Sequence, residues 1–353
     1  MQAMEQPTKI AFLGAALDCD ERQEALEEKL ASLGLGGDPF PRVMELIRRE
    51  VDPVRWQEAG QLAVPAWLLP GPPPEAAAEL SVAAMVGFVD QGGCQAAADE
   101  VGRLAQAAWP AAPCLIAVDH SLAGGVMAAL SARLGPQNLS VLVADSHTDA
   151  IPMAALAGAI AYDQATNPAS VYDPDDPYLR DRPESYNASS FLRRLLDQGL
   201  ILPGNLYLLG LGDWPPKQAL RIKDPRLAAY TQAYARLKQA GAGVVTKADL
   251  AAGSQKLVAL LRRIQTPYLY VSLDLDLGAG AALNGVRFRD RVGISERQLY
   301  ALAAAVRGVL DRGAALAGLD LCEFNGRRAG ADRTYRIAAN LIEMIAFGQE
   351  PRA

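Results

Sequence analysis

The chain alternates short runs of β-branched and apolar residues with longer segments rich in Ala and Leu, and this alternation restricts the fold more than any other feature. Each short run suits a buried strand, and each longer segment suits a helix. Parallel strands need helical crossovers, so repeated βα units predict a parallel sheet covered by helices. We therefore expect an α/β fold with three α/β/α layers around a central, mostly parallel sheet of about eight strands.

Counting the hydrophobic period along the chain places the individual elements. The predicted strands cover residues 9–14, 61–69, 114–118, 140–145, 205–210, 243–246, 268–274 and 317–321. The predicted helices cover residues 95–108, 122–134, 227–239, 256–264, 296–312 and 334–345. The sequence has no short-period repeat and no low-complexity tail, so we expect residues 1–353 to form one domain.

Two segments do not fit regular elements. The Pro-rich run at 70–74 can continue neither a helix nor an interior strand, which predicts a loop or crossover connection. Residues 164–187 are polar and rich in Pro and Asp. Long irregular insertions are often functional or mobile, so we expect a long loop or lid there.

Charge and cysteine content exclude several function classes. The net charge of -6 and the pI near 5.2 oppose binding to nucleic acid or an anionic membrane, because both need a clustered positive field. The four cysteines lack CxxC spacing, which favours reduced thiols. The chain start lacks the pattern of a signal peptide, and the apolar run at 80–89 is too short to span a bilayer. We expect a cytoplasmic protein.

Acidic and imidazole side chains follow two predicted strands directly. Asp145, His147 and Asp149 come after one apolar run, and Asp274 and Asp276 come after another. In an extended chain, residues two apart face the same way, so the side chains of each motif can converge. Parallel strands end at a common edge of the sheet, where open α/β proteins bind ligands. The sequence therefore predicts one crevice lined by these five side chains.

His120 lies just beyond a third predicted strand and extends this set. The chain has only two histidines, and both belong to it. An isolated Asp-x-Asp is more often a cap or a turn than a metal site. Four carboxylates crowded at buried strand ends, however, repel one another unless cations hold them, so the joint pattern predicts a metal site.

Oxygen-rich ligands with two imidazoles favour Mn²⁺ first, with Zn²⁺, Co²⁺ or Fe²⁺ as substitutes. The predicted ligands are His120, Asp145, His147, Asp149, Asp274 and Asp276. Six ligands are too many for one open catalytic ion. Two ions that share bridging carboxylates, roughly 3.5–4 Å apart, would use all six and could activate a bridging water as a hydroxide nucleophile.

These motifs resemble those of the ureohydrolases, the family of arginase, agmatinase and their relatives. Residues 119–121 (DHS) resemble the end of the family's GGDHS motif, residues 145–149 (DSHTD) its DAHxD motif, and residues 272–276 (SLDLD) the start of SxDxDxxDP. Residues 318–325 resemble the last family strand, and residues 332–339 the closing helix. The motifs stand in the family's order, and the chain is identified as a divergent member.

The resemblance implies an arginase-like fold and two manganese ions. By this likeness one ion takes His120 and Asp149 and the other takes His147 and Asp276. The remaining two ligands, Asp145 and Asp274, bridge both ions. Homo-oligomers are common in the family, so a homo-oligomer is an open expectation.

The implied reaction is hydrolysis of a linear carbon–nitrogen bond in a small molecule, typically a guanidino compound that releases urea. Asp149 would accept a hydrogen bond from the bridging hydroxide and orient it. Glu323 would hold a cationic guanidinium or amidinium by paired charged hydrogen bonds. From the residues alone, Glu323 could instead cap a turn or pair with Arg327.

The sequence departs from the family pattern beside these motifs. Residues 117–118 (AV) replace two glycines, and residues 279–280 (AG) stand where the family has Asp-Pro. Arginases and agmatinases carry a further histidine after the DAHxD motif, whereas this chain has none, and Tyr162 lies near that place as a packing residue or a proton shuttle. Residues 150–153 (AIPM) are apolar where arginases hold the amino-acid end of arginine, so free arginine is disfavoured as the substrate.

Two other functions stay open. A deacetylase of the same broad fold would cleave acetyl amides with one zinc and a pair of catalytic histidines, which this chain cannot supply beyond its predicted ligands. A metal-bound regulatory or binding protein without catalysis agrees with the missing histidine. The complete set of six ligands opposes it.

Overall fold

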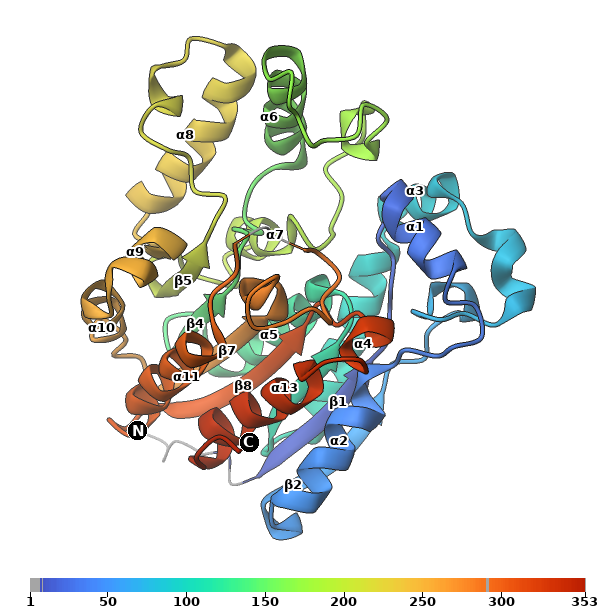
Figure 1. The fold of residues 1–353 in the computed structure, drawn as a ribbon. Helices are drawn as coiled ribbons and strands as arrows, with labels where there is room; N and C mark the ends of the chain where they lie inside the picture. Colours follow the sequence, from blue (N-terminus) through green and yellow to red (C-terminus); the bar gives the residue numbers. More distant parts are fainter. Residues whose placement is uncertain (1–6, 8, 290–291, 353) are drawn as a thin grey trace.

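Eight parallel strands form one sheet between two helical layers in the computed structural model, which describes residues 7, 9–289 and 292–352 (Figure 1). The strand order is β2-β1-β3-β8-β7-β4-β5-β6, and each neighbouring pair is parallel. The predicted three-layer α/β/α fold with about eight strands is confirmed. The expectation for the chain start concerns residues 1–6 and 8, which lie outside the described residues.

The described strands are β1 (Ile10–Ala15), β2 (Trp56–Gln61), β3 (Ala112–Ala117), β4 (Leu139–Ala144), β5 (Leu206–Leu211), β6 (Gly243–Thr246), β7 (Tyr268–Asp274) and β8 (Ala315–Cys322). The α-helices are α1 (Gln23–Leu30), α2 (Pro39–Glu50), α3 (Val82–Asp90), α4 (Gly93–Ala108), α5 (Ala123–Leu134), α6 (Met153–Thr166), α7 (Phe191–Asp197), α8 (Pro225–Gln239), α9 (Lys247–Ala252), α10 (Gln255–Leu261), α11 (Glu296–Leu310), α12 (Gly326–Ala329) and α13 (Thr334–Ile342). A π-helical turn, Glu343–Phe347, continues α13.

Side chains of the inner strands alternate between two hydrophobic cores. In β1, Ile10 and Phe12 join the core that contains α2, α10, α11 and α13. Leu13 and Ala15 of the same strand join the core that contains α3, α4, α5 and α7. Successive strand residues point to opposite faces, so a strand buried on both sides needs a continuous apolar run. The sequence of the central strands meets this requirement.

The strand predicted at residues 61–69 is wrong. The edge strand is β2, Trp56–Gln61, which pairs with β1 and exposes most of its side chains. Residues 62–69 leave the sheet, and Ala66–Leu68 form a 3-10 turn after Pro65. Proline cannot donate to a strand ladder, and the apolar character of this run comes from the packing of Leu68, which is fully buried.

The six predicted helices correspond to α4, α5, α8, α10, α11 and α13, with ends shifted by a few residues. The irregular segment begins at Asn167 rather than at 164, because α6 continues to Thr166. Its one regular turn is Pro177–Leu179. Arg182 of this segment donates to Glu21 (2.7 Å) and pairs with Asp90 (2.7 Å), which ties the segment to the loop after β1 and to the end of α3.

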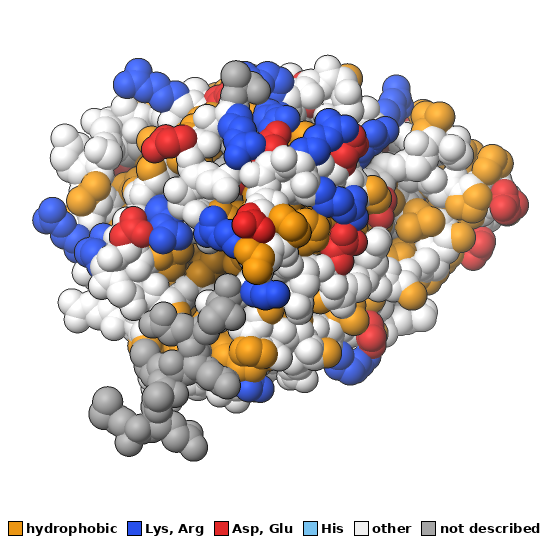
Figure 2. All heavy atoms as spheres, turned by 90° about the horizontal axis from the view of Figure 1, so that it is seen from below, with side chains coloured by type: hydrophobic (Ala, Val, Ile, Leu, Met, Phe, Trp, Pro, Cys, Tyr) orange, Lys and Arg blue, Asp and Glu red, His pale blue; other side chains and the backbone are white. Residues whose placement is uncertain are grey.

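Acidic and basic side chains lie among one another on the face drawn in Figure 2, without a continuous basic area. No helix in the described part of the chain is both long and apolar enough to cross a membrane.

Candidate metal centre

The predicted site residues follow the four central strands of the sheet, β3, β8, β7 and β4. His120 follows β3, Asp145 follows β4, Asp274 ends β7 and Glu323 follows β8. All four are buried, with exposed fractions of 8% or less. Parallel strands end at one edge, so residues 203 positions apart in the sequence meet: Glu323 Oε1 lies 3.2 Å from His120 N.

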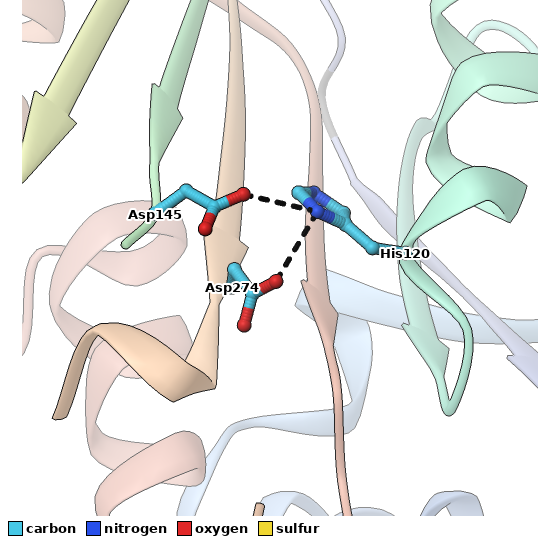
Figure 3. A group of neighbouring side chains, drawn as sticks. All are labelled: His120, Asp145 and Asp274. Carbon is cyan, nitrogen blue, oxygen red and sulfur yellow. Dashed lines mark ion pairs between the residues drawn. The ribbon is translucent and has the colours of Figure 1, made fainter. Parts of the chain in front are cut away.

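The ring of His120 faces a cluster of carboxylates (Figure 3). Its Nδ1 lies 3.3 Å from Oδ2 of both Asp145 and Asp274. Asp149 Oδ2 lies 2.9 Å from the same nitrogen. These three carboxylates come from two strand ends, so their convergence on one imidazole nitrogen is a product of the parallel sheet.

The contacts of the other ring nitrogen, Nε2, show which nitrogen carries the proton when His120 is neutral. Ser272 Oγ donates its only hydrogen to Asp320 Oδ1 (2.9 Å). His120 Nε2 lies 2.8 Å from the same Oγ and must therefore donate to it. A neutral ring then turns the lone pair of Nδ1 toward three carboxylates. This arrangement needs a cation between them.

Unpaired atoms and pKa shifts both indicate that a cation is missing between His120 and the carboxylates. Among the described residues, His120 Nδ1 and Asp145 Oδ2 are buried without a hydrogen-bond partner. Burial lowers the pKa of His120, but the three facing carboxylates raise it well above its usual value. Burial, together with the neighbouring carboxylates, raises the pKa of Asp149 and of Asp274. In the chain alone a bound proton offsets the negative charge of the carboxylates, and a divalent ion at the same place can replace that proton.

A second group of ligand-type atoms shares Asp145 with the first. His147 Nδ1 lies 2.9 Å from Asp276 Oδ2 and 3.7 Å from Asp145 Oδ1. In each group, His120–Asp145–Asp274 and Asp145–His147–Asp276, one ligand atom per residue lies within 4.8 Å of the others. The residues present therefore fit two adjacent ions with a shared carboxylate.

Two of these carboxylates also shape their own loops. Asp145 Oδ1 accepts a hydrogen bond from His147 N (2.6 Å), and Asp274 Oδ1 accepts one from Asp276 N (2.7 Å). Such Asx turns fold the chain directly after each strand. Each carboxylate thus uses one oxygen for the turn and presents the other, Oδ2, to His120. The turn and the ligand interpretations of the Asp-x-Asp pattern are compatible.

Asp149 has a left-handed backbone with φ of 50°, which is unusual for a residue other than glycine. Its carbonyl accepts a hydrogen bond from Leu192 N (3.0 Å) at the start of α7. The preceding Thr148 donates its N–H and its hydroxyl to Asp213 (2.9 Å each). Strained residues of this kind cluster at functional sites, and these contacts hold the strain. Asp213 was not predicted, because nothing in the sequence links it to residue 148.

Glu323 also has a left-handed backbone, with φ of 67°. Its Oε1 accepts from His120 N and lies 3.3 Å from Arg287 Nη1. The ion pair is thus made with Arg287, and the expected alternative with Arg327 is wrong. Burial raises the pKa of Glu323 to about 7, although Arg287 opposes this shift.

One side of the cluster is open to solvent. The His147 side chain is 35% exposed and meets the Phe288 ring edge-on, with centroids 4.8 Å apart. The Arg22 guanidinium makes a cation–π contact with Phe288, 4.8 Å from the ring centroid. A small molecule would reach the metal ligands from this side. Neither Phe288 nor Arg22 could be predicted, because no periodic pattern or motif points to them.

The model of the arginase family matches residues 54–348, which is most of the chain. The chain belongs to the arginase family. The ureohydrolase resemblance predicted from three short motifs is therefore confirmed. A search of curated proteins found no match.

Solved structures support the arginase-family fold at low sequence identity. Proclavaminate amidino hydrolase from Streptomyces clavuligerus covers 98% of this chain and 94% of its own, at 18% identity and a TM-score of 0.58. An arginase from Bacillus subtilis covers 97% of this chain and 99% of its own, at 16% identity and a TM-score of 0.64. A Trypanosoma cruzi formiminoglutamase variant with Mn²⁺ covers 99% of this chain and 96% of its own, at 13% identity and a TM-score of 0.60. At these identities the structural likeness concerns the fold.

Tyr162, placed near the missing histidine of other family members, lies on α6. The Arg226 guanidinium of α8 lies 5.6 Å from its ring centroid. Tyr172, in the irregular segment, is a different hydroxyl, and burial together with the Asp163 charge raises its pKa. The position of Tyr162 between α6 and α8 favours packing.

Proposed function

We propose that this arginase-family chain is a hydrolase of a linear carbon–nitrogen bond in a small amidino, guanidino or related compound, dependent on two divalent ions. Manganese is the first choice. The observation that carries the proposal is the sharing of Asp145 by two ligand groups, each with one histidine and a further aspartate. Related folds that act on amidino, guanidino and formimino compounds support the same bond type.

Each ligand has a proposed place. His120 and Asp149 would hold one ion, and His147 and Asp276 would hold the other. Asp145 and Asp274 would be shared by the two ions. Oxygen and imidazole ligands suit Mn²⁺, and other borderline divalent ions are candidate substitutes. When bound, such a pair of ions lowers the pKa of water toward neutrality and polarises the group to be cleaved.

Asp149 and Glu323 are the proposed catalytic residues. Asp149 accepts a hydrogen bond from the attacking water and sets its direction, a task suited to a carboxylate held in a strained loop. Glu323 lies at the edge of the ligand cluster, and its Oε1 contacts the backbone of His120. Its carboxylate faces the reacting group of the substrate from beside the ions.

A metal-binding homologue without catalysis is the second candidate function. One observation favours it: the Glu323 carboxylate is already paired with Arg287. The deacetylase alternative finds less support, because both histidines of the chain lie in the ligand groups and neither remains for acid–base work.

Metal analysis of the purified protein, combined with a screen of turnover in added Mn²⁺, tests the proposal. The screen measures urea, ammonia and acetate release from guanidino, amidino, ureido and amide compounds. Two ions per chain with release of urea or ammonia are expected. One zinc per chain with acetate release would support the deacetylase, and two ions without any turnover would support the binding protein.

A further inference from the structure

Arg287 is the one cation that contacts Glu323 in the described part of the chain, and it comes from the segment between β7 and α11. Its Nη1 lies 3.3 Å from Glu323 Oε1 and donates to Asp119 Oδ2 and Val118 O at 3.2 Å each. The side chain is 9% exposed. This guanidinium is therefore a buried part of the wall beside the candidate ions.

Further carboxylates surround the same guanidinium. Arg287 Nε lies 3.4 Å from Asp18 Oδ1, and Nη2 lies 3.8 Å from Asp20 Oδ2. These two aspartates have additional internal cations, since Lys29 pairs with Asp18 (3.5 Å) and Arg22 pairs with Asp20. The carboxylates on this side of the site are thus matched by cations of the chain itself.

The backbone holds Arg287 in this place. Arg287 N donates to Glu323 O (2.9 Å), and Val286 forms an antiparallel bridge with Phe324. The segment that carries the guanidinium is therefore joined to the segment that carries its carboxylate. Displacing the guanidinium would remove the cation that the buried carboxylates of Asp119 and Glu323 share, which is costly.

We propose that Arg287 is a specificity-determining residue: it occupies the cation position at Glu323 from within the chain, so the site takes substrates whose reacting carbon–nitrogen group is uncharged. This inference rests on the proposed function and, among compounds with a linear carbon–nitrogen bond, favours ureido or carboxamide groups over guanidinium or amidinium groups. Such a group has a carbonyl oxygen where a guanidinium has a charged nitrogen. It has no positive charge that requires a free Glu323.

The reaction balances without a further reactant. The oxygen of water forms a bond to the carbonyl carbon, the carbon–nitrogen bond breaks, and the nitrogen leaves with a proton from that water. Glu323, paired with Arg287, acts as an acceptor for the N–H of an uncharged group and not as a counter-ion.

Matched probes and variants test the role of Arg287. Methylguanidinium and methylurea have the same shape but differ in charge, and their binding is measured by thermal shift and titration calorimetry at low-millimolar concentration. We expect Arg287→Ala to bind methylguanidinium at least about tenfold more tightly than the wild type does. Arg289→Ala is the control, because Arg289 lies in the same segment and its side chain is 55% exposed. It should behave like the wild type.

Arg287→Gln keeps much of the side-chain volume and serves if the alanine variant does not fold. Wild-type binding of methylguanidinium that disappears in Glu323→Gln would overturn the inference, whatever the variants of Arg287 do. Equal binding by Arg287→Gln and Arg289→Ala would also overturn it. Mn²⁺ titration of the same samples separates the two proposals, since loss of metal binding speaks against the proposed function and the probe result speaks only about Arg287.

Discussion

Two clusters of carboxylates meet at Glu323 and differ in how their charge is balanced. The cluster around Asp145 contains four aspartates, and the basic side chains that contact them in the described part of the chain are the imidazoles of His120 and His147. The cluster around Arg287 contains Asp18, Asp20, Asp119 and Glu323, with guanidinium or ammonium groups beside them. Both are largely buried.

The difference indicates which cluster awaits an outside cation. Buried carboxylates must be paired, protonated or bound to metal. Around Arg287 the chain supplies the cations, and the ion pairs complete the fold. Around Asp145 the contacts are with histidines, and among the described residues two facing atoms, His120 Nδ1 and Asp145 Oδ2, are buried without a hydrogen-bond partner. The cluster around Asp145 is therefore the candidate metal site, and the cluster around Arg287 forms a wall beside it.

Neutralising the shared ligand should have the largest effect. Asp145→Asn keeps the oxygen that accepts from His147 N but removes the charge that both ions share. We expect activity to fall at least about a thousandfold, roughly 4 kcal/mol in transition-state stabilisation, with loss of bound metal. Steady-state rates and metal content measure this. Asp197→Asn, an exposed aspartate on α7, is the control and should change neither.

Removing the internal cation should have a smaller effect of another kind. Arg287→Ala removes the cation that the buried carboxylates of Asp119 and Glu323 share, so the unfolding free energy should fall by about 2–4 kcal/mol even in chelator. Arg289→Ala should cost less than about 0.5 kcal/mol, because exposed ion pairs contribute little. Urea denaturation of both variants gives the comparison. A cost for Arg287→Ala no larger than that of Arg289→Ala would remove the distinction between the clusters.

The smallest effect concerns a buried carboxyl away from the site. Burial and then Glu50 raise the pKa of Glu343 from an ordinary 4.5 to about 7, although Arg352 and Arg336 oppose this. The folded state therefore keeps a proton between these values, and the unfolding free energy falls as pH rises through this window.

Glu343→Gln removes this dependence. We expect it to be more stable than the wild type by about 1–2 kcal/mol at pH 8 and equal to it near pH 5, as measured by thermal or urea unfolding. Glu50→Gln is the opposite control. Although burial alone raises the pKa of Glu50, its hydrogen bonds with Arg336 lower it, so this variant should lose stability at pH 8. A gain at pH 5 for Glu343→Gln would contradict the assignment.

Most of the fold could be predicted because the central strands are apolar on both faces and the helices carry clear periodic patterns. β2 was misplaced because an exposed edge strand has little hydrophobic pattern, while the apolar run beside it packs as irregular chain around Leu68. α6 was missed because its Ala-rich sequence has no strong polar face.

The candidate ligands could be predicted because the Asp-x-His-x-Asp and Asp-x-Asp patterns follow apolar strands directly, and parallel strands share an edge. Arg287 could not be predicted, since its segment between β7 and α11 has no periodic pattern that would fix where the side chain lies. Asp213 could not be predicted either, because its hydrogen bond with Thr148 joins residues that no sequence pattern connects. Resemblance indicated a role for Glu323, but only the contacts show that the chain already holds a cation there.

Anomalous scattering from crystals grown with Mn²⁺ would show whether two ions bind at the cluster around Asp145. We expect two anomalous peaks roughly 3.5–4 Å apart. One should lie between His120 and Asp149, the other between His147 and Asp276, with Asp145 touching both. A single peak, no peak, or a peak beside Arg287 instead of Asp145 would contradict this expectation.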